Sequence, residues 1–425
     1  MKVMVVGGGG REDALCWKIA RSPLVSEIVC APGNAGITKR ARCVAVAAAD
    51  TEAMVALALK EKPELVVIGP EVSLSLGLAD ALEAKKIRVF GPSKAAAEIE
   101  GSKVFSKQFM RRHSIPTADF DVFENVDDAI RALGETDFPV VIKADGLAAG
   151  KGVFVCQKRK DAENALRSIM SDKVFGESGN RIVMEQFLPG AELSFFAISD
   201  GQTVIPLEPS QDHKRLLDGD CGPNTGGMGA YTPAPIATGE IREKIMNEFM
   251  KPAIEGMAEE GKPYKGVLYA GLMIDGADIK LLEFNCRFGD PETQPLMMRM
   301  KSDIVPLLAA AADGTLANQK PPEWNESAAV CVVMASNGYP GKYEKGAELK
   351  GIPNDGEESV VFHAGTAEKD GKVVTGSGRV LGVTALGDTI RKAAARAYET
   401  VERIDGETGS GTLVYRKDIG NRSGG

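Results

Sequence analysis

"LLEFNCRFGDPETQ", residues 281–294, places a polar side chain at every second position after an apolar start. In a β-strand, residues i, i+2 and i+4 share one face, so Glu283, Asn285 and Arg287 would lie together while the residues between them pack inward. A carboxylate and an amide oxygen suit Mg²⁺, and a guanidinium suits a phosphate. Two interpretations are open at this point: a metal and phosphate site, or a polar strand end with a surface ion pair.

The composition of the chain limits the function classes. Its 425 residues predict about three domains, and 44% hydrophobic with 26% charged residues is ordinary for a globular protein. A net charge of −8 argues against a nucleic-acid surface. The seven scattered cysteines have no zinc spacing and are typical of a reducing compartment. No apolar run approaches membrane-spanning length, and no signal peptide is visible, so we expect a cytoplasmic protein without membrane contact.

Residues 1–92 alternate strand and helix patterns. Short apolar strands are expected at 3–7, 27–32, 64–70 and 87–92, with helices around 11–21, 51–61 and 75–86, which predicts a parallel sheet covered by helices. The glycines at 7–10 lack the spacing of a dinucleotide fingerprint, and the second strand ends without an acidic residue. NAD binding is therefore not predicted, although such a turn suits an anion.

The rest of the chain divides into further units. Residues 93–112 read as helical, with Ser93 as N-cap and a break at Gly101. Strands near 138–144, 152–156, 181–187 and 192–198, with a helix near 160–170, predict an antiparallel α+β lid. Residues 204–231 read mostly as loop, and a linker is expected at 314–327. We therefore predict domains at 1–102, 103–313 (with the lid at about 120–190) and 328–425.

Two further segments have the character of ligand-binding loops. "DGLAAGKG", residues 145–152, is a glycine hairpin between two strands and not a Walker A loop, because the spacing differs and a strand follows. Lys143, just before it, stands in an apolar strand and therefore needs an anionic partner. "QDHKRLLDGDCGPNTGGMGAY", residues 211–231, is dense in charge and glycine, which favours a binding loop over a solvated surface loop.

These segments together resemble a known family. "KADGLAAGKG" (143–152), "MEQFLPGAELS" (184–194) and "EFNCRFGDPE" (283–292), in that order, resemble the ATP-grasp superfamily. "GREDA", "PGNAG", "FGPSKAAAEIEGSK", "SQDHKR", "GPNTGGMGAY" and "GRVLGV" resemble, more narrowly, the phosphoribosylamine–glycine ligases. The resemblance covers nearly the whole chain. It implies an α/β and α+β multidomain fold: an N-terminal parallel α/β domain, an ATP-grasp core with an antiparallel lid, and a small C-terminal α+β domain.

The resemblance also implies roles for individual residues. Metal ligands would be Glu283 and Asn285, for Mg²⁺ or Mn²⁺. Catalytic groups would be Arg287, Asp212 and Lys214. ATP would be bound by Lys103, Lys143, Gly150, Lys151, Gly152, Glu185, Phe187, Leu188 and Glu192. The other substrates would contact Gly9, Arg11, Glu71, Asp212, Thr225, Gly226, Gly227, Asp290 and Arg379. Asp13 stands where the family commonly has histidine; a carboxylate that faced the phosphoribosyl site would repel a phosphate, whereas one that pointed away would not.

The implied reaction joins glycine to 5-phosphoribosylamine with ATP, through glycyl phosphate, in de novo purine synthesis. The 145–152 hairpin would close over this reactive intermediate. One alternative is another ATP-grasp carboxylate–amine ligase of purine metabolism, and a second is a nucleotide-binding protein without turnover. We expect a monomer, or at most a weak dimer.

Overall fold

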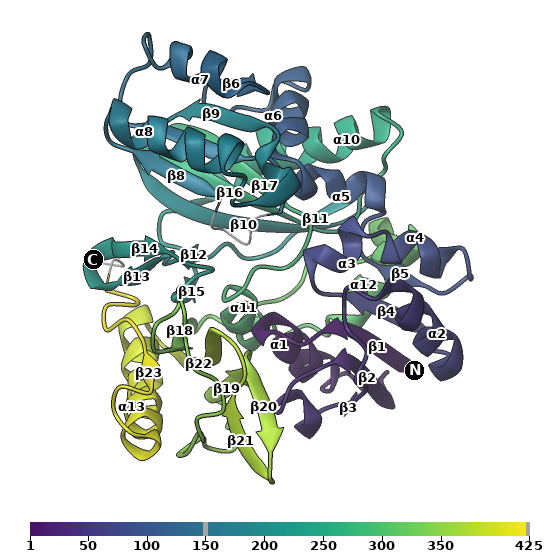
Figure 1. Ribbon diagram of the computed structural model, residues 1–425. Helices are drawn as coiled ribbons and strands as arrows, with labels where there is room; N and C mark the ends of the chain where they lie inside the picture. The colour runs from purple at the N-terminus through teal and green to yellow at the C-terminus, as the bar shows by residue number, and fades with distance from the viewer. Residues whose placement is uncertain (148–151, 422–425) are drawn as a thin grey trace.

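The N-terminal part of the computed structural model, which describes residues 1–147 and 152–421, is a parallel sheet covered by helices (Figure 1). The strand order is β3-β2-β1-β4-β5, and every pairing is parallel, as predicted. The strands are β1 (Lys2–Gly7), β2 (Glu27–Pro32), β3 (Arg42–Cys43), β4 (Leu65–Ile68) and β5 (Val89–Phe90). The helices are α1 (Gly10–Ile19), α2 (Thr51–Glu61), α3 (Glu71–Ser75) and α4 (Leu78–Glu83). The single helix expected at 75–86 is divided because Gly77 adopts a φ of +86°, which ends α3.

Two helices join this sheet to the centre of the molecule. They are α5 (Lys94–Gly101) and α6 (Lys103–Arg112). Ser93 caps α5 as predicted, because its side chain accepts a hydrogen bond from the N–H of Ala96. The break falls one residue after Gly101: Ser102 is extended, caps α6 and donates to Asp145 at 2.9 Å. This contact ties the helix start to the strand that leads into the glycine hairpin.

Two antiparallel sheets follow, and they meet at a turn. The lid sheet has the order β6-β9-β7-β8 and the central sheet the order β11-β10-β16-β17. The lid strands are β6 (Phe120–Phe123), β7 (Val140–Ala144), β8 (Val153–Cys156) and β9 (Ile182–Gln186). The central strands are β10 (Ala191–Asp200), β11 (Val204–Pro206), β16 (Lys265–Asp275) and β17 (Asp278–Asn285). Two helices cover the lid: α7 (Val126–Ala132) and α8 (Arg159–Leu166).

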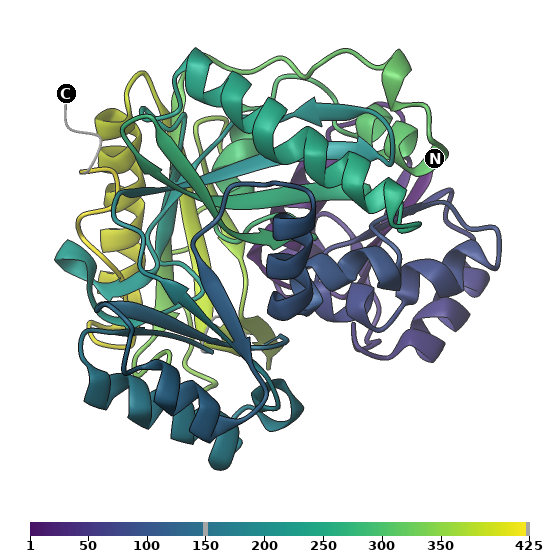
Figure 2. The same cartoon turned by 90° about the horizontal axis from the view of Figure 1, so that it is seen from above.

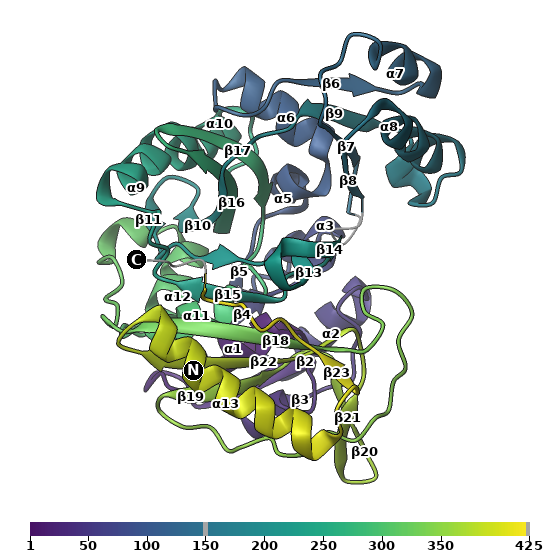
Figure 3. The same ribbon diagram turned by 90° about the vertical axis from the view of Figure 1, so that its left-hand side faces the viewer.

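The prediction that the strand near 192–198 belongs to the lid sheet was wrong. β10 pairs with β16 over its whole length and so lies in the central sheet. The chain crosses between the sheets at Gly190, where φ is +125° and a Cβ would lie 2.4 Å from the carbonyl oxygen of Ile274. Glycine permits both the crossing and this close approach, and the lid lies beside the central sheet (Figure 3).

The C-terminal sheet includes two short strands from the 204–231 segment, which was expected to be mostly loop. Its order is β12-β15-β18-β22-β19, with β23 paired to β18. The strands are β12 (Gln211–Asp212), β15 (Gly229–Thr232), β18 (Ala328–Ser336), β19 (Ser359–His363), β22 (Arg379–Gly387) and β23 (Leu413–Val414). Two hairpins stand apart: β13 (Arg215–Leu217) with β14 (Cys221–Asn224), and β20 (Thr366–Lys369) with β21 (Lys372–Thr375). Residues 211–212 and 229–232 therefore extend the C-terminal sheet, and the hairpin between them does not belong to it.

The remaining helices pack on these sheets. They are α9 (Gly239–Ile245), α10 (Lys251–Glu259), α11 (Thr293–Arg299), α12 (Val305–Asp313) and α13 (Ile390–Thr408). α11 and α12 are separate helices, with residues 300–304 between them. Figure 2 shows α13 and the N-terminal helices on opposite sides of the molecule. Over residues 1–147 and 152–421, no helix is long and apolar enough to cross a membrane.

Candidate active site

A cleft of about 980 Å³ lies between the lid, the central sheet, the N-terminal domain and the C-terminal sheet. Most of the residues predicted from the sequence line it. They are Arg11, Glu71, Lys103, Lys143, Gly152, Glu185, Phe187, Leu188, Glu192, Asp212, Lys214, Thr225, Gly226, Glu283, Asn285, Arg287, Asp290 and Arg379. Gly9 and Gly227 are not among the lining residues: Gly9 donates to Glu12, and Gly227 accepts a hydrogen bond from Arg379, which lines the cleft. Gly150 and Lys151, with the middle of the predicted closing hairpin, lie outside the described residues.

A β-bulge in β17 turns the polar residues toward this cleft. Glu283 pairs with Gly271 of β16, but the next pair is Leu281 with Leu272, so Leu282 is an extra residue. Ile279 and Leu281, before the bulge, share one core cluster with Phe284 and Cys286 after it. Without the bulge, strict alternation would put Glu283 on the same face as Leu281, inside the core. The alternation from 283 onward was predicted, and the bulge was not.

Cations surround the Glu283 carboxylate. Burial alone would raise the pKa of Glu283, but neighbouring positive charges outweigh burial and lower it to about 2. These charges belong to Lys103, Lys214, Lys143 and Arg287. Glu283 is therefore ionised throughout the neutral range. The half-buried Glu283 carboxylate among several cations is suited to a metal ion bound together with a polyphosphate.

Glu185, expected to bind ATP, is held between two lysines. Its carboxylate forms ion pairs with Lys143 of β7 and with Lys107 of α6, and all three side chains are almost fully buried. Lys143 also donates to the carbonyl oxygen of Leu282 at 3.2 Å, which is the bulge residue. The anionic partner required by a lysine inside an apolar strand is thus Glu185. The network connects the lid strand, α6 and the bulge.

Arg287 is fixed by two carboxylates. Its guanidinium lies 3.4 Å from Glu71 and 3.3 Å from Glu100, measured between nitrogen and carboxylate oxygen. Burial would raise the pKa of Glu71, but Arg11 and Arg287 lower it to about 2. Glu71 therefore bridges the two arginines. Glu100 lines the cleft and was missed from the sequence; its helical spacing from the buried Ala96 and Ala97 could have revealed that it faces inward.

Asp212 and Lys214, both predicted from the sequence, lie near two further carboxylates, Glu192 and Glu292. Lys214 contacts Glu192 at 2.8 Å. Burial raises the pKa of Asp212 to about 7; Lys214 opposes this shift, and the charge of Glu292 adds to it. Glu292, also missed from the sequence, is 2% exposed and accepts hydrogen bonds from Tyr269 (2.9 Å) and Ser194 (3.1 Å). A carboxyl group that titrates near neutrality can serve as a general base.

The N-terminal turn forms the other end of the cleft. Arg11 contacts Glu71 at 3.3 Å and donates to the carbonyl oxygen of Phe288 at 3.0 Å. Its neighbour Glu12, missed from the sequence, is 2% exposed and accepts from the N–H of Gly9 at 2.6 Å. Asp290 lies 3.6 Å from the guanidinium of Arg379, which also donates to the carbonyl oxygens of Gly226 and Gly227. The turn, the 225–227 loop and the C-terminal domain therefore converge here.

Asp13 points away from the cleft. It is fully buried, pairs with Arg40 at 2.6 Å and accepts from the backbone N–H of His363 at 2.7 Å. The carboxylate therefore joins the N-terminal and C-terminal domains and does not face the substrate end of the cleft. The repulsion of a phosphate that this residue could have caused does not arise.

Replacing Asp13 by alanine should lower stability without changing substrate affinity. The substitution leaves the buried Arg40 with one carboxylate partner fewer and the N–H of His363 unpaired, at a cost of about 2 kcal/mol or more. Urea unfolding gives the stability, and KM for the phosphorylated substrate gives the affinity. A tenfold rise in that KM at unchanged stability would place Asp13 at the substrate.

No preformed cage of metal ligands exists in the part of the chain that the structure describes: no group of three or more His, Cys, Asp or Glu side chains is placed to hold a metal ion. Glu283 and Asn285 offer two oxygen ligands on the cleft wall. Two protein ligands suit Mg²⁺, which takes its remaining ligands from water and phosphate oxygens.

Comparison with known proteins gives consistent results along the chain. Residues 1–100 match the phosphoribosylglycinamide synthetase N domain, residues 101–293 its ATP-grasp (A) domain and residues 329–422 its C domain. The phosphoribosylamine–glycine ligase of Pasteurella multocida is 49% identical over 426 residues, covering 100% of this chain and 98% of its own length. That of Salmonella typhi is 49% identical over 430 residues, covering 100% and 99%.

Solved structures agree. The crystal structure of phosphoribosylamine–glycine ligase from Thermotoga maritima has a TM-score of 0.85 and 36% identity, and covers 99% of this chain and 100% of its own. A biotin carboxylase domain from Hydrogenobacter thermophilus has a TM-score of 0.74 at 19% identity, covering 94% of this chain and 89% of its own, and shares the fold. The predicted fold class and family resemblance are thereby confirmed.

Proposed function

Because this chain belongs to the phosphoribosylglycinamide synthetase family, we propose that it joins glycine to 5-phosphoribosylamine, with conversion of ATP to ADP and phosphate. The observation that carries the proposal is the charge arrangement of the cleft, where an ionised Glu283 stands among four cations. This arrangement fits a metal–ATP complex. The full-length match to relatives named phosphoribosylamine–glycine ligase favours this reaction over those of other ATP-grasp ligases.

In the first step, the glycine carboxylate attacks the γ-phosphate of ATP, and ADP leaves. Charge develops on the transferred phosphoryl oxygens, and we assign its stabilisation to Arg287, Lys143 and Lys214. Glu283 and Asn285 would hold Mg²⁺ or Mn²⁺, which when bound neutralises phosphate charge and orients the ATP. Arg287 is already fixed between Glu71 and Glu100, so little reorganisation is needed during the reaction.

In the second step, the amine of phosphoribosylamine attacks the acyl carbon of glycyl phosphate. A C–N bond forms, the C–O bond to the phosphate breaks, and the nitrogen loses a proton. We assign proton acceptance to Asp212, since its pKa of about 7 matches the task. The substrate phosphate would lie at the Gly9–Arg11 turn near the N-terminus of α1 and Arg379.

Other assignments carried from the sequence remain proposals. Adenine would lie near Phe187 and Leu188, and its ribose near Glu192, which is already paired with Lys214. We propose the divisions at 1–102, 103–313 and 328–425 as working domain boundaries, and a monomer as the active unit.

The proposed activity is tested by ADP release that depends on both glycine and phosphoribosylamine. Formate and bicarbonate replace glycine in parallel reactions, and the products are identified by mass spectrometry. ADP release with formate or bicarbonate but not glycine would assign the chain to a sister ligase. The absence of any turnover, with ATP still bound, would favour a nucleotide-binding protein.

Glycine labelled with ¹⁸O in its carboxylate should transfer one labelled oxygen to inorganic phosphate in each turnover. The reason is that one carboxylate oxygen becomes the bridge of glycyl phosphate and leaves with the phosphorus. Mass spectrometry of the released phosphate measures this transfer, and a reaction without phosphoribosylamine is the control. Unlabelled phosphate at full turnover would exclude the acyl phosphate route.

A further inference from the structure

The hairpin formed by β13, β14 and their connection, residues 215–224, lies at the edge of the cleft with little core to hold it. Arg215, Asp220 and Asn224 line the cleft. None of residues 215–224 is buried, and Leu217 is 53% exposed. The two strands pair only with each other within the described chain. Apolar packing therefore cannot set the position of this hairpin.

The base of the hairpin is held by the cleft residues themselves. Thr225 donates its N–H and its hydroxyl to the carbonyl oxygen of Lys214, both at 2.8 Å. Lys214 and Thr225 also line the cleft. A displacement of the hairpin would therefore reach two side chains that belong to the proposed glycine and phosphate end.

The outer part of the hairpin is held by Arg416, far away in the sequence. Its side chain is fully buried and donates to Asp220 at 2.8 Å and to the carbonyl oxygen of Arg215 at 3.3 Å. It also donates twice to Asp418, at 2.7 and 2.6 Å. Asp418 in turn accepts from the N–H of Gly219 at 2.9 Å. The guanidinium thus joins the hairpin to the C-terminal segment through a fixed set of donors.

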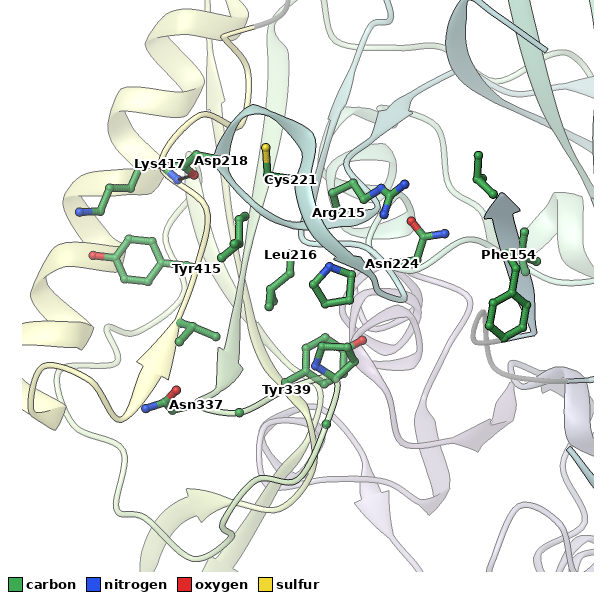
Figure 4. A pocket seen from close by; sticks show the side chains of 18 of the residues that line it. Phe154, Arg215, Leu216, Asp218, Cys221, Asn224, Asn337, Tyr339, Tyr415 and Lys417 are labelled. Atoms are coloured by element: carbon green, nitrogen blue, oxygen red, sulfur yellow. Dashed lines mark hydrogen bonds between the residues drawn. The ribbon is translucent and has the colours of Figure 1, made fainter. Parts of the chain in front are cut away.

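The C-terminal segment is itself anchored. The hydroxyl of Tyr398, on α13, donates to the carbonyl oxygen of Arg416 and accepts from the N–H of Ile419. A further contact joins the N–H of Lys417 to Asp218 at 2.8 Å. Figure 4 shows the hairpin between Tyr415 and Lys417 on one side and Phe154 of the lid on the other. The hairpin is therefore attached to the C-terminal domain and borders the lid.

We propose that Arg416 is a positioning residue that sets the place of the 215–224 hairpin, and with it Lys214 and Arg215, for the reaction. The proposal rests on the proposed function, because it assigns this end of the cleft to glycine and the transferred phosphoryl group. Among the described residues, Arg416 has no hydrogen bond or ion pair with Phe187, Leu188 or Glu192 of the adenine end. Its loss should therefore lower kcat and raise KM for glycine, with a much smaller effect on nucleotide affinity, transmitted only through the Lys214–Glu192 ion pair.

The test compares Arg416→Lys with Asp418→Asn. Lysine keeps the charge but cannot donate to Asp220, Asp418 and the carbonyl of Arg215 in one plane. Asp418→Asn keeps the shape of the side chain and removes its charge, at a position that does not line the cleft. Each variant should lower kcat about tenfold or more, with the affinity for ADP within twofold of wild type. The control is Arg396→Lys, on α13, where Arg396 binds Glu358 and the carbonyl of Leu386 inside the C-terminal domain.

Hydrogen exchange supplies a readout that does not depend on turnover. Peptides covering 213–226 should exchange faster in both variants, while peptides covering 126–147 keep the wild-type rate. The positioning role would be overturned by any of three results. These are a wild-type kcat in folded variants, unchanged exchange at 213–226, and a loss of ADP affinity as large as the loss of turnover. Failure of the wild-type protein to use glycine would instead overturn the proposed function. Hydrogen exchange would then still show whether Arg416 holds the 215–224 hairpin in place.

Discussion

Glu283→Gln should lower kcat by about 10³-fold and leave the fold intact. Glutamine has nearly the same volume, so packing around β17 changes little. It removes a carboxylate charge that lies among Lys103, Lys143, Lys214 and Arg287 and that its pKa of about 2 keeps ionised. A neutral amide binds Mg²⁺ weakly, so the metal should no longer be held beside the phosphates.

The metal dependence of ATP binding separates this effect from a general loss of the site. Wild type should bind ATP more tightly with Mg²⁺ than without it, and Glu283→Gln should lose that difference. Asp278→Asn is the matched control, because Asp278 is an exposed carboxylate at the start of the same strand. Near-normal turnover of Glu283→Gln at millimolar Mg²⁺ would remove Glu283 from the metal site.

Arg287→Ala should lower kcat by about 10³-fold or more, as expected for a guanidinium that stabilises a transferring phosphoryl group. The substitution also leaves Glu71 and Glu100 without their shared partner. Arg287→Lys keeps a positive charge between them and serves as the second variant. It should fold like wild type and recover only part of the activity, because an ammonium cannot contact both carboxylates and a phosphate in one plane.

Single-turnover measurements of ADP formation show which step is affected. Both Arg287 variants should slow ADP formation itself, while equilibrium binding of ATP changes much less. If ADP forms at the wild-type rate and only amide formation slows, Arg287 acts in the second step and its assignment to phosphoryl transfer is wrong. Thermal unfolding of each variant excludes a simple loss of folded protein.

Local patterns predicted the N-terminal sheet and the polar residues of β17 from the sequence. Buried parallel strands are continuous apolar runs, and the alternation after Glu283 needs only a period of two. Pairing between distant segments was not predictable in this way. β12 and β15 became strands because they extend β18 of a different domain, and β10 lies in the central sheet because it pairs with β16.

The site residues that the sequence did not reveal are those that act through other residues. Glu100 holds Arg287, Glu12 accepts from Gly9, and Arg416 holds the hairpin. Glu12 and Glu100 lie in stretches that resemble the family, but the spacing of these stretches does not by itself indicate chemistry. Glu100 and Arg416 meet their partners only in the folded chain, whereas Glu12 is three residues from Gly9. The residues to which we assign metal and phosphate binding stand in short segments of the sequence, which is why the sequence alone suggested them.

The bulge at Leu282 has a consequence for how this strand can change over generations. Side-chain replacements before or after the bulge leave the register unchanged, so each residue keeps the face that it has now. A gain or loss of a single codon at the bulge is different. It would exchange the two faces on one side of the bulge, so that either Glu283 enters the interior or Leu281 leaves it. This strand can therefore accept substitutions more readily than insertions or deletions.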